Sequence, residues 1–455
     1  MSLEIINRSK LQLVDIEYDY RTDAKDSEKD YYGDNVGKYP LVYYKGLSIE
    51  SDDILYLTLT NDDFLPKLEM KFNDKSNKLF GDIYPLDNDL ISIFIRAQNE
   101  SSMPVRMDFK ITVFNPTKPV GKENQKLIYY LEGELNVDTL YNTEFRSDKG
   151  TSYSILKKIS EESQLGFATN IDGTQDEMTW LNPADYTMYY MKEITIKSFK
   201  NDSSFLSSYI DFYYNFCFVN VEIELKADIS TVQNVGNESA YTTSSTKEED
   251  NITKLKLTNH PDYNDTNTYI DKFNLLDEKT SFHLKEGYSR YIRWYDKLKN
   301  SYKFFHLKVI KENDKDKYSQ LSPVSGRYLG KLDIDNMHEN YLFADQQNSY
   351  NMLMLQKTNM LITLTRPNFS LNRFQKVLLE LYSLGQLDDV GFNQDAVTTE
   401  KNPKVDDAKI NKRLSGEWII IGISYTFSKK DGNVQEITLA KRSLNEEYTP
   451  NTSKK

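Results

Sequence analysis

The stretch from Leu414 to Leu444 decides the fold, and it reads LSGEWIIIGISYTFSKKDGNVQEITLAKRSL. Two segments with the alternation of a β-strand flank Asp431-Gly432, a pair typical of tight hairpin turns because the central residues need positive φ. Alternation predicts that one face of the first segment is apolar and consists of Ile419, Ile421, Ile423, Tyr425 and Phe427. The opposite face begins with Trp418 and Ile420 and then becomes small and polar.

A single hairpin is marginally stable in water, so this one must belong to a larger sheet. We expect it to close a β-barrel. An aspartate in place of Ile421 is then expected to abolish folding, because it would bury an unpaired charge. The residues that we expect to form the protein core are Trp180, Pro183, Phe205, Trp418, Ile419, Ile421, Ile423 and Phe427.

Length and charge narrow the class of protein. The chain has 455 residues, enough for two to four domains. Its net charge of −12 argues against duplex DNA as a bound ligand, because phosphate binding needs clustered Lys and Arg, although DNA could still slide past an acidic wall. No apolar run approaches the ~20 residues of a membrane span, and the N-terminus lacks the pattern of a signal peptide. We therefore expect no membrane insertion.

The sequence offers no convincing catalytic, cofactor-binding or metal-binding residues. Cys217 is the single cysteine, which excludes an intrachain disulfide, and it lies in an alternating segment that predicts a buried thiol. The histidines have no metal-ligand spacing; they are His260, His283, His306 and His338. The segment 333–336 resembles the start of a calcium loop, but the later glycine and glutamate are missing. Adjacent acids such as Glu161-Glu162 are more typical of a solvated surface than of a glycosidase pair. We expect no enzyme activity and no cofactor.

The pattern along the chain predicts four regions in a mainly β protein with an α+β insert. Residues 1–145 contain short alternating segments separated by turn residues, which indicates a first small β-barrel. Residues 321–455 indicate a second one, with a long polar loop at 385–413. Within it, the spacing of residues 377–382 fits either a helix or a strand.

The middle of the chain has a mixed pattern. Residues 146–226 predict an α+β domain: a helix from Ser152 that stops at Gly166, a helix around Tyr189, a helix after Asp202, and a half-buried strand at 217–225. Residues 227–320 predict a linker and mixed connecting domain. Its segment 227–265 is polar, and four later aromatic residues at helical spacing predict a packed helix face; they are Tyr288, Tyr291, Trp294 and Tyr295.

Three groups of motifs occur in order along the chain. The first comprises Phe64-Leu65-Pro66, Asp87-Asn88-Asp89 and Met107-Asp108-Phe109. The second comprises Met178-Thr179-Trp180-Leu181-Asn182-Pro183, Asn201-Asp202-Ser203-Ser204-Phe205, Tyr213-Tyr214-Asn215-Phe216 and Val219-Asn220-Val221. The third is the strand that begins at Leu414 and the segment Leu439-Ala440-Lys441-Arg442. Together they resemble the central baseplate hub protein of contractile-tailed bacteriophages, which is related to the barrel domains of type VI secretion spike proteins.

This resemblance implies two similar β-barrel domains in each chain and a homotrimer whose six barrels form a ring with approximate six-fold symmetry. Such a ring would join a three-fold central spike to a six-fold tail tube, contact other baseplate proteins and leave a channel through which genomic DNA passes without specific binding. The protein would belong to the tail baseplate of the virion and be assembled in the cytoplasm of the host bacterium. The resemblance also favours a strand at 377–382. From the residues alone, a tail adhesin that binds host glycans and, less favoured, a cell-wall hydrolase remain alternatives.

Overall fold

The computed structural model describes residues 3–11, 40–49, 51–74, 78–81, 83–86, 88–95, 105–117, 127–227, 256–260, 269–277, 289–296, 301–308, 337–338, 340–364, 367–368, 371–383, 409–428, 432–442 and 444. The greater part of the polar segments predicted at 227–265 and 385–413 lies outside these residues, as does the segment 333–336; the described parts of the two polar segments include the short strands β14 (Lys256–Thr258) and β21 (Lys409–Ile410).

Most of the strands belong to one long curled sheet that has two halves. The first half-sheet has the order β4-β5-β8-β7-β6-β2-β3, and all of its neighbouring strands are antiparallel. Its strands are β2 (Leu41–Tyr44), β3 (Leu47–Ile49), β4 (Ile54–Asn61), β5 (Lys67–Asp74), β6 (Leu90–Ile95), β7 (Val105–Thr117) and β8 (Leu127–Leu135). Two short helical turns accompany them, η1 (Ser51–Asp53) and α2 (Lys78–Gly81).

The second half-sheet has the order β15-β18-β23-β22-β19-β14. Its strands are β14 (Lys256–Thr258), β15 (Ile270–Asp277), β18 (Thr358–Leu364), β19 (Lys376–Glu380), β22 (Gly416–Ser428) and β23 (Gly432–Lys441). Two separate strand pairs lie outside this sheet: β16 (Ser289–Asp296) with β17 (Ser301–Lys308), and β20 (Tyr382–Ser383) with β21 (Lys409–Ile410). The strand favoured at 377–382 is present as β19 and β20.

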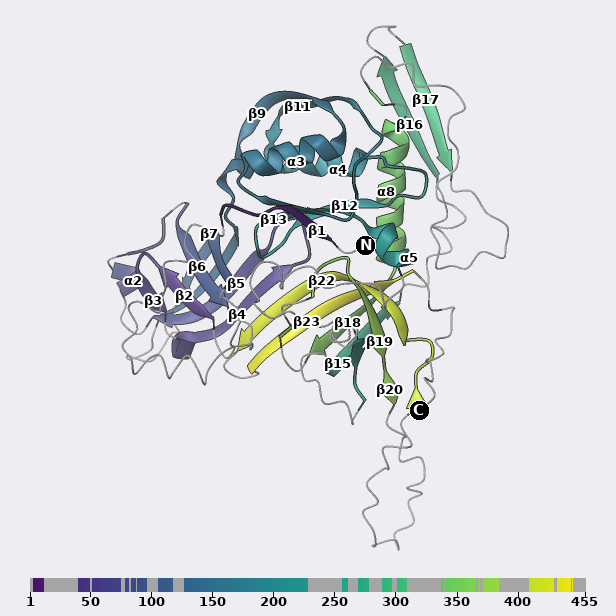
Figure 1. Ribbon diagram of the computed structural model, residues 1–455. Coiled ribbons are helices and arrows are strands. Elements are labelled where there is room, and N and C mark those ends of the chain that lie inside the picture. The colour runs from purple at the N-terminus through teal and green to yellow at the C-terminus, as the bar shows by residue number, and fades with distance from the viewer. Residues whose placement is uncertain are drawn as a thin grey trace, which may run out of the picture.

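An α+β unit lies above both half-sheets in Figure 1. Its sheet has the order β1-β10-β13-β12, and a two-stranded ribbon of β9 and β11 stands apart from that sheet. The strands are β1 (Glu4–Asn7), β9 (Thr143–Gly150), β10 (Gly166–Thr169), β11 (Met178–Tyr186), β12 (Leu206–Ile210) and β13 (Asn215–Asn220). The helices are η2 (Asp138–Tyr141), α3 (Ser152–Glu162), α4 (Thr187–Lys197), α5 (Val221–Lys226) and α8 (Tyr341–Leu355).

The predicted fold class, mainly β with an α+β insert, is confirmed. The hairpin β22–β23, however, closes no cylinder among the described strands. It lies inside the sheet, with β18 on one side and β4 on the other, so it joins the two halves. The hairpin can join the two halves because β22 is long enough to pair with two strands: its first part pairs with β19, and its second part pairs with β4.

The prediction that Ile419 and Ile421 share a face with Ile423 is wrong. A bulge between Ile420 and Gly422 inserts one extra residue into β22 relative to β23, and this shifts the alternation by one position. Ile423 therefore packs with Trp418 and Ile420 in the main core, whereas Ile419 and half-buried Ile421 pack with the α+β unit.

Several segments differ from their predicted secondary structure. The helix expected after Asp202 is strand β12. Both faces of this strand are buried, so its apolar residues lack the alternation that would have distinguished it from a helix. The strand expected at 217–225 ends at Asn220, whose side chain caps the helix α5. Three of the four aromatic residues that were predicted to form a helix face lie in strand β16; they are Tyr291, Trp294 and Tyr295. Helix α8 was not predicted from the sequence.

The first predicted helix is present as α3, with different ends. Thr151 is the N-cap, since its side chain accepts a hydrogen bond from the Ser154 N–H. Gly166 does not end this helix but begins β10. A Cβ there would lie 2.9 Å from the Asn7 carbonyl oxygen, so glycine is required by the close approach of β1.

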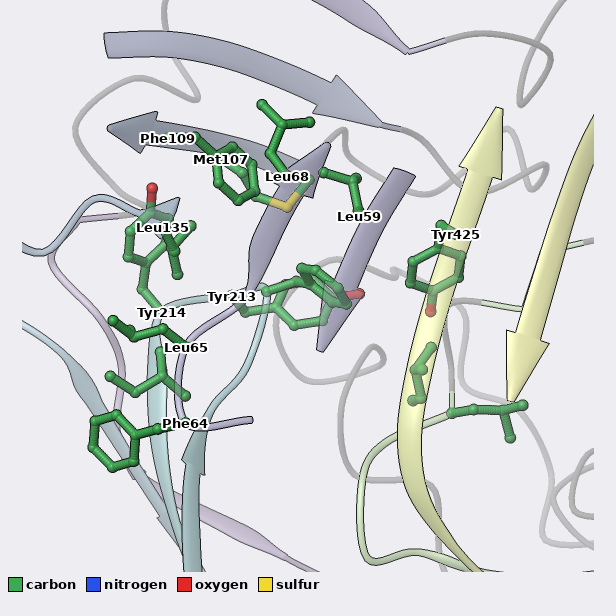
Figure 2. Packing of buried hydrophobic residues seen from close by; sticks show 14 of the residues in the cluster. Leu59, Phe64, Leu65, Leu68, Met107, Phe109, Leu135, Tyr213, Tyr214 and Tyr425 are labelled. Atoms are coloured by element: carbon green, nitrogen blue, oxygen red, sulfur yellow. The ribbon is translucent and has the colours of Figure 1, made fainter. Parts of the chain in front are cut away.

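The core of the first half-sheet continues into its neighbours, as Figure 2 shows. Leu59 and Leu68 line the sheet interior, and Tyr425 of β22 reaches in from the second half-sheet. From the α+β unit, Tyr213 and Tyr214 enter beside Leu65, and the Tyr214 hydroxyl accepts a hydrogen bond from the Asp108 N–H at 2.8 Å. The three units therefore share one hydrophobic core.

The two half-sheets repeat one arrangement. In each, a strand of 13 residues lies in the interior, β7 in the first and β22 in the second, and each is bulged against its following strand. The turn that enters the shorter neighbouring strand contains a residue with positive φ in both halves, Asn88 at 69° and Phe374 at 60°. The chain therefore contains a structural duplication that the amino-acid types conceal.

Candidate functional site

The junction between the half-sheets is the candidate functional site, because three units meet there through one strand. The second part of β22 runs antiparallel to β4, with Ser424 opposite Thr60 and Thr426 opposite Thr58. Hydroxyl groups of both pairs are hydrogen bonded across the strands at 3.1 Å. The small polar face that the sequence showed in β22 therefore matches an equally small polar face of β4.

Arg373 lies at the centre of this junction and is almost completely buried. Its Nε donates to the Ile421 carbonyl oxygen at 2.9 Å, and its Nη1 donates to Asn61 Oδ1 at 3.3 Å and to the carbonyl oxygen of Asp63. Burial lowers the pKa of the guanidinium below its usual value. One side chain therefore connects the bulge of β22 to the end of β4.

The α+β unit is attached at the same point. The guanidinium carbon of Arg373 lies 5.0 Å from the centre of the Tyr209 ring, and the Tyr209 hydroxyl donates to the Arg373 carbonyl oxygen at 3.1 Å. The Ile210 N–H donates to the Phe64 carbonyl oxygen at 2.8 Å, and Asn61 Nδ2 donates to the Ile210 carbonyl oxygen at 3.2 Å. Strand β12 is thereby fixed to the loop that joins β4 and β5.

Two titratable groups beneath Tyr209 show what this junction can do chemically. Burial raises the pKa of Asp211 to about 6, while hydrogen bonds from Asn215 oppose the rise. Burial also raises the pKa of the Cys217 thiol well above its usual value. A thiol that stays protonated is a poor nucleophile, so this pair is suited to structural hydrogen bonding and not to covalent catalysis.

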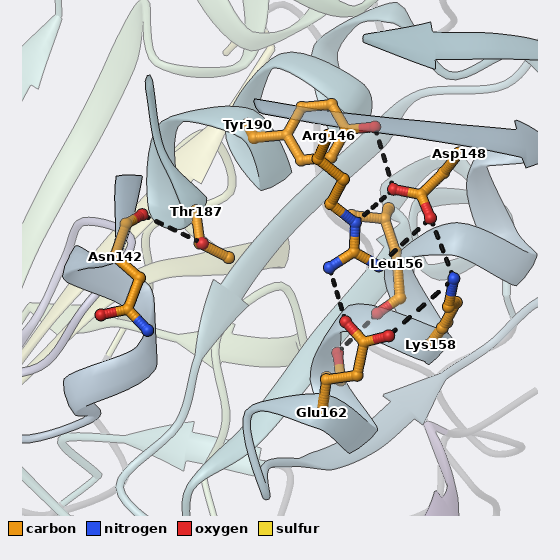
Figure 3. A network of polar contacts seen from close by, with 9 residues as sticks. Asn142, Arg146, Asp148, Leu156, Lys158, Glu162, Thr187 and Tyr190 are labelled. Carbon is orange, nitrogen blue, oxygen red and sulfur yellow. Dashed lines mark hydrogen bonds and ion pairs between the residues drawn. The ribbon is translucent and has the colours of Figure 1, made fainter. Parts of the chain in front are cut away.

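A second polar cluster holds the ribbon of β9 and β11 against helix α3 (Figure 3). Asp148 accepts from the Arg146 guanidinium, from Lys158 Nζ at 3.0 Å and from the Tyr190 hydroxyl at 3.4 Å. Burial alone would raise the pKa of Asp148, but Arg146 and Lys158 hold it below its usual value. Glu162 forms an ion pair with Arg146, and the lowered pKa of Asp148 keeps that carboxylate ionised and unsuited to donate a proton.

Helix α8 is fastened to the α+β unit by buried amide groups. Asn348 Oδ1 accepts from the Leu206 N–H at 2.9 Å, and its Nδ2 donates to the carbonyl oxygens of Ile196 and Ser198, both at 3.0 Å. At the end of β23, the buried guanidinium of Arg442 lies 3.2 Å from Glu222 of α5. Helix α8 leads directly into β18, so the second half-sheet is joined to the α+β unit both through this helix and through the ion pair of Arg442 with Glu222.

The structure places the predicted core residues as follows. Buried side chains are Trp180, Phe205, Trp418, Ile419, Ile423 and Phe427, and Ile421 is half-buried. Pro183 is exposed and does not belong to the core, because it lies on the outward face of β11 opposite Phe145. Sequence reasoning missed Arg373, since an arginine in a polar segment gives no sign that it is buried.

Within the described ranges, no group of three or more His, Cys, Asp or Glu residues is arranged to hold a metal ion. None of the described helices combines the length and the apolar character needed to cross a membrane.

Comparison with known proteins gives structural similarity only. No protein-family model matches the chain, and no curated protein sequence matches it. A tail protein from Neisseria meningitidis MC58 matches with 12% identity and a TM-score of 0.44, covering 90% of this chain and 99% of that chain. The 43 kDa tail protein of prophage MuSo2 from Shewanella oneidensis matches with 7% identity and a TM-score of 0.47, covering 90% and 98%.

A third solved structure is an E. coli component of the type VI secretion system, described as structurally similar to bacteriophage T4 tail proteins. It matches with 8% identity and a TM-score of 0.42, covering 90% of this chain and 79% of that chain. Phage tail proteins and type VI secretion proteins are thus among the structures similar to this chain, and they are the classes that the sequence resemblance named.

Proposed function

We propose that the protein is the structural hub of a contractile-tail baseplate and has no catalytic role. Three copies form a ring with approximate six-fold symmetry, which joins the central spike to the tail tube. The observation that carries this proposal is the duplication: in each of the two half-sheets five antiparallel strands follow in the same order, with the same long bulged strand and the same entry turn. Three chains therefore supply six equivalent half-sheets, which is what an adapter between three-fold and six-fold partners requires.

The junction supports a rigid adapter. Arg373 and its neighbours fix the angle between the half-sheets with buried hydrogen bonds, and a ring closes only if that angle is constant from copy to copy. The net charge of −12 fits a channel through which DNA passes without being held, since phosphate binding depends on clustered cations.

Mass photometry of the purified chain, alone and with the neighbouring tail gene products, tests this proposal. The expected result is a species of three times 53.2 kDa, seen as a three-fold ring by negative-stain imaging. Obligate contacts of this kind bury about 2,000 Å² or more, and measurement over a range of protein concentrations gives the concentration at which the ring dissociates. A chain that stays monomeric at every concentration, even with its tail partners present, would overturn the proposal.

A further inference from the structure

Backbone hydrogen bonds and bulges identify equivalent positions in β7 and β22. In each half-sheet, the residue that precedes the shorter neighbouring strand accepts a hydrogen bond from the long strand, and a bulge follows directly. The two bonds, both 3.0 Å, run from Ile111 N–H to the Asp89 carbonyl and from Ile420 N–H to the Gln375 carbonyl. These marks align Ile111 with Ile420, and they therefore align Asn115 with Ser424.

Strands β4 and β15 are equivalent by the same kind of evidence. Each carries a bulge near its start, between Ile54 and Tyr56 in β4 and between Ile270 and Lys272 in β15. The bulges align Leu57 with Phe273 and Thr60 with Leu276. The contact between β4 and β22 inside the chain therefore defines where a second contact, between β15 and β7, would form.

Burial shows that this second contact is not made within one chain. Leu57 is completely buried because β22 covers the edge of β4, whereas the equivalent Phe273 is 47% exposed. Leu276 is 60% exposed. Among the residues that the structure describes, β15 pairs along its length with β18 alone, and residues 113–117 of β7 pair with β8 alone. Within the described part of the chain, two strand edges are therefore open, and they correspond to the two sides of the β4–β22 junction.

We propose that β15 of one copy pairs with the second part of β7 in the next copy, antiparallel and in the register of the β4–β22 junction. Asn115 then faces Leu276 of the next copy, and Thr117 faces Asn274. The proposal rests on the proposed trimer and names its contact surface. Because the two edges differ, the contact is head-to-tail, and such contacts close into a ring when the rotation per copy allows it.

The occupant of both edges is a second copy of this chain, because the contact continues an interface that the chain itself displays. Exposed strand edges with apolar side chains invite pairing, and natural monomers usually shield them. Pro116 has no N–H, so this edge offers fewer backbone donors than β22 does. Burial of Leu276, opposite Asn115, therefore has to supply a larger share of the stability than the hydroxyl pairs supply within the chain.

Disulfide trapping tests this contact directly. The double variant Asn115→Cys/Leu276→Cys places thiols at the positions equivalent to Ser424 and Thr60, whose side-chain oxygens lie 3.1 Å apart. Under mild oxidation, non-reducing electrophoresis should show covalent dimers and trimers and nothing larger. Ser424→Cys/Thr60→Cys is the positive control, since it should form a disulfide within one chain. Asn115→Cys/Leu353→Cys is the negative control, because Leu353 is exposed on α8 and away from the proposed contact.

Assembly of the variants is measured separately by mass photometry, which distinguishes the possible failures. Trimers of Asn115→Cys/Leu276→Cys that cross-link no more than the Leu353 control would overturn the proposed register and leave the hub intact. A monomer throughout would overturn both proposals. As an independent test, Leu276→Asp should raise the concentration at which half of the trimer dissociates by about tenfold or more relative to Leu353→Asp. Equal effects of the two aspartates would also overturn the proposal.

Discussion

The strands β22 and β7 have the same length, the same bulge and the same position in their half-sheets, yet their second parts differ in chemistry. In β22 this part carries buried Ile423, Tyr425 and Phe427, whereas in β7 it carries half-buried Phe114 and exposed Pro116. The two strands thus share a backbone arrangement, whereas their residue types differ according to what each strand contacts. A strand that is covered within its own chain has a continuous apolar face, and one that is not covered does not.

The entry turns differ in the same way. Both adopt positive φ, which asparagine tolerates at Asn88 and which is strained for Phe374. The Phe374 ring is buried, and its centre lies 5.8 Å from the centre of the Tyr209 ring and 5.3 Å from the guanidinium carbon of Arg373. Packing at the junction therefore compensates for backbone strain, and the first half-sheet, which has no such junction at this turn, uses the residue that fits the backbone.

Aspartate substitutions at equivalent positions of the two half-sheets should show the largest difference in stability. Leu57→Asp would bury an unpaired charge in the core and should cost roughly 4 kcal/mol or more, giving insoluble or unfolded protein. Phe273→Asp, at the equivalent position, leaves the charge accessible to water and should fold. Thermal unfolding monitored by circular dichroism measures both. A Phe273→Asp chain as unstable as Leu57→Asp would show that the two positions are equally buried.

The attachment of the second half-sheet to α5 should give the next largest effect. Arg442 and Glu222 are both buried, so removing either side chain takes a buried charge away from its partner, and Glu222→Gln should cost about 3–5 kcal/mol. Arg442→Met should cost less, because Lys226 Nζ still lies 3.1 Å from the other carboxylate oxygen of Glu222. The double variant should be more stable than either single one, because it buries no unpaired charge. Urea unfolding of all four proteins measures this coupling. Additive losses would mean that the ion pair does not join β23 to α5.

Much of this architecture could be predicted from alternation, and the parts that could not have definite physical causes. Leu57, Leu68 and Ile93 alternate with polar residues because one face of each strand is wet, so these strands were readable. The bulge beside Ile421 is marked in the sequence only by Gly422, since an isolated glycine in a strand often accompanies a bulge, and the alternation alone predicted the wrong faces beyond that point. Strand β12 is buried on both faces, which removes the alternation that distinguishes a strand from a helix.

The junction between the half-sheets could not be predicted from the sequence, for a related reason. Its key residue, Arg373, is recruited by carbonyl oxygens from segments that are more than 300 positions away in the sequence as well as from β22, and one-dimensional patterns do not report such contacts. The alternation predicted two small β-barrels, and the family resemblance added the expectation of a duplication. It becomes evident in the structure from hydrogen bonds and bulges, because the two half-sheets share backbone geometry and not side chains.

The smallest expected effect concerns the hydroxyl pairs of the covered edge. Thr58→Val and Thr426→Val keep the branched shape and remove the 3.1 Å hydrogen bond, so each should cost about 0.5–1 kcal/mol. The double variant Thr58→Val/Thr426→Val should cost less than the sum, since both groups lose their partner together. In the proposed contact between copies, Thr117 is the position equivalent to Thr426, so Thr117→Val should leave the unfolding free energy of the monomer unchanged and alter only assembly. If the monomeric Thr117→Val chain unfolds at lower urea concentration than the unmodified chain, Thr117 already has a structural partner within its own chain. The edge of β7 would then be covered, as the edge of β22 is, and the comparison between the two edges would fail.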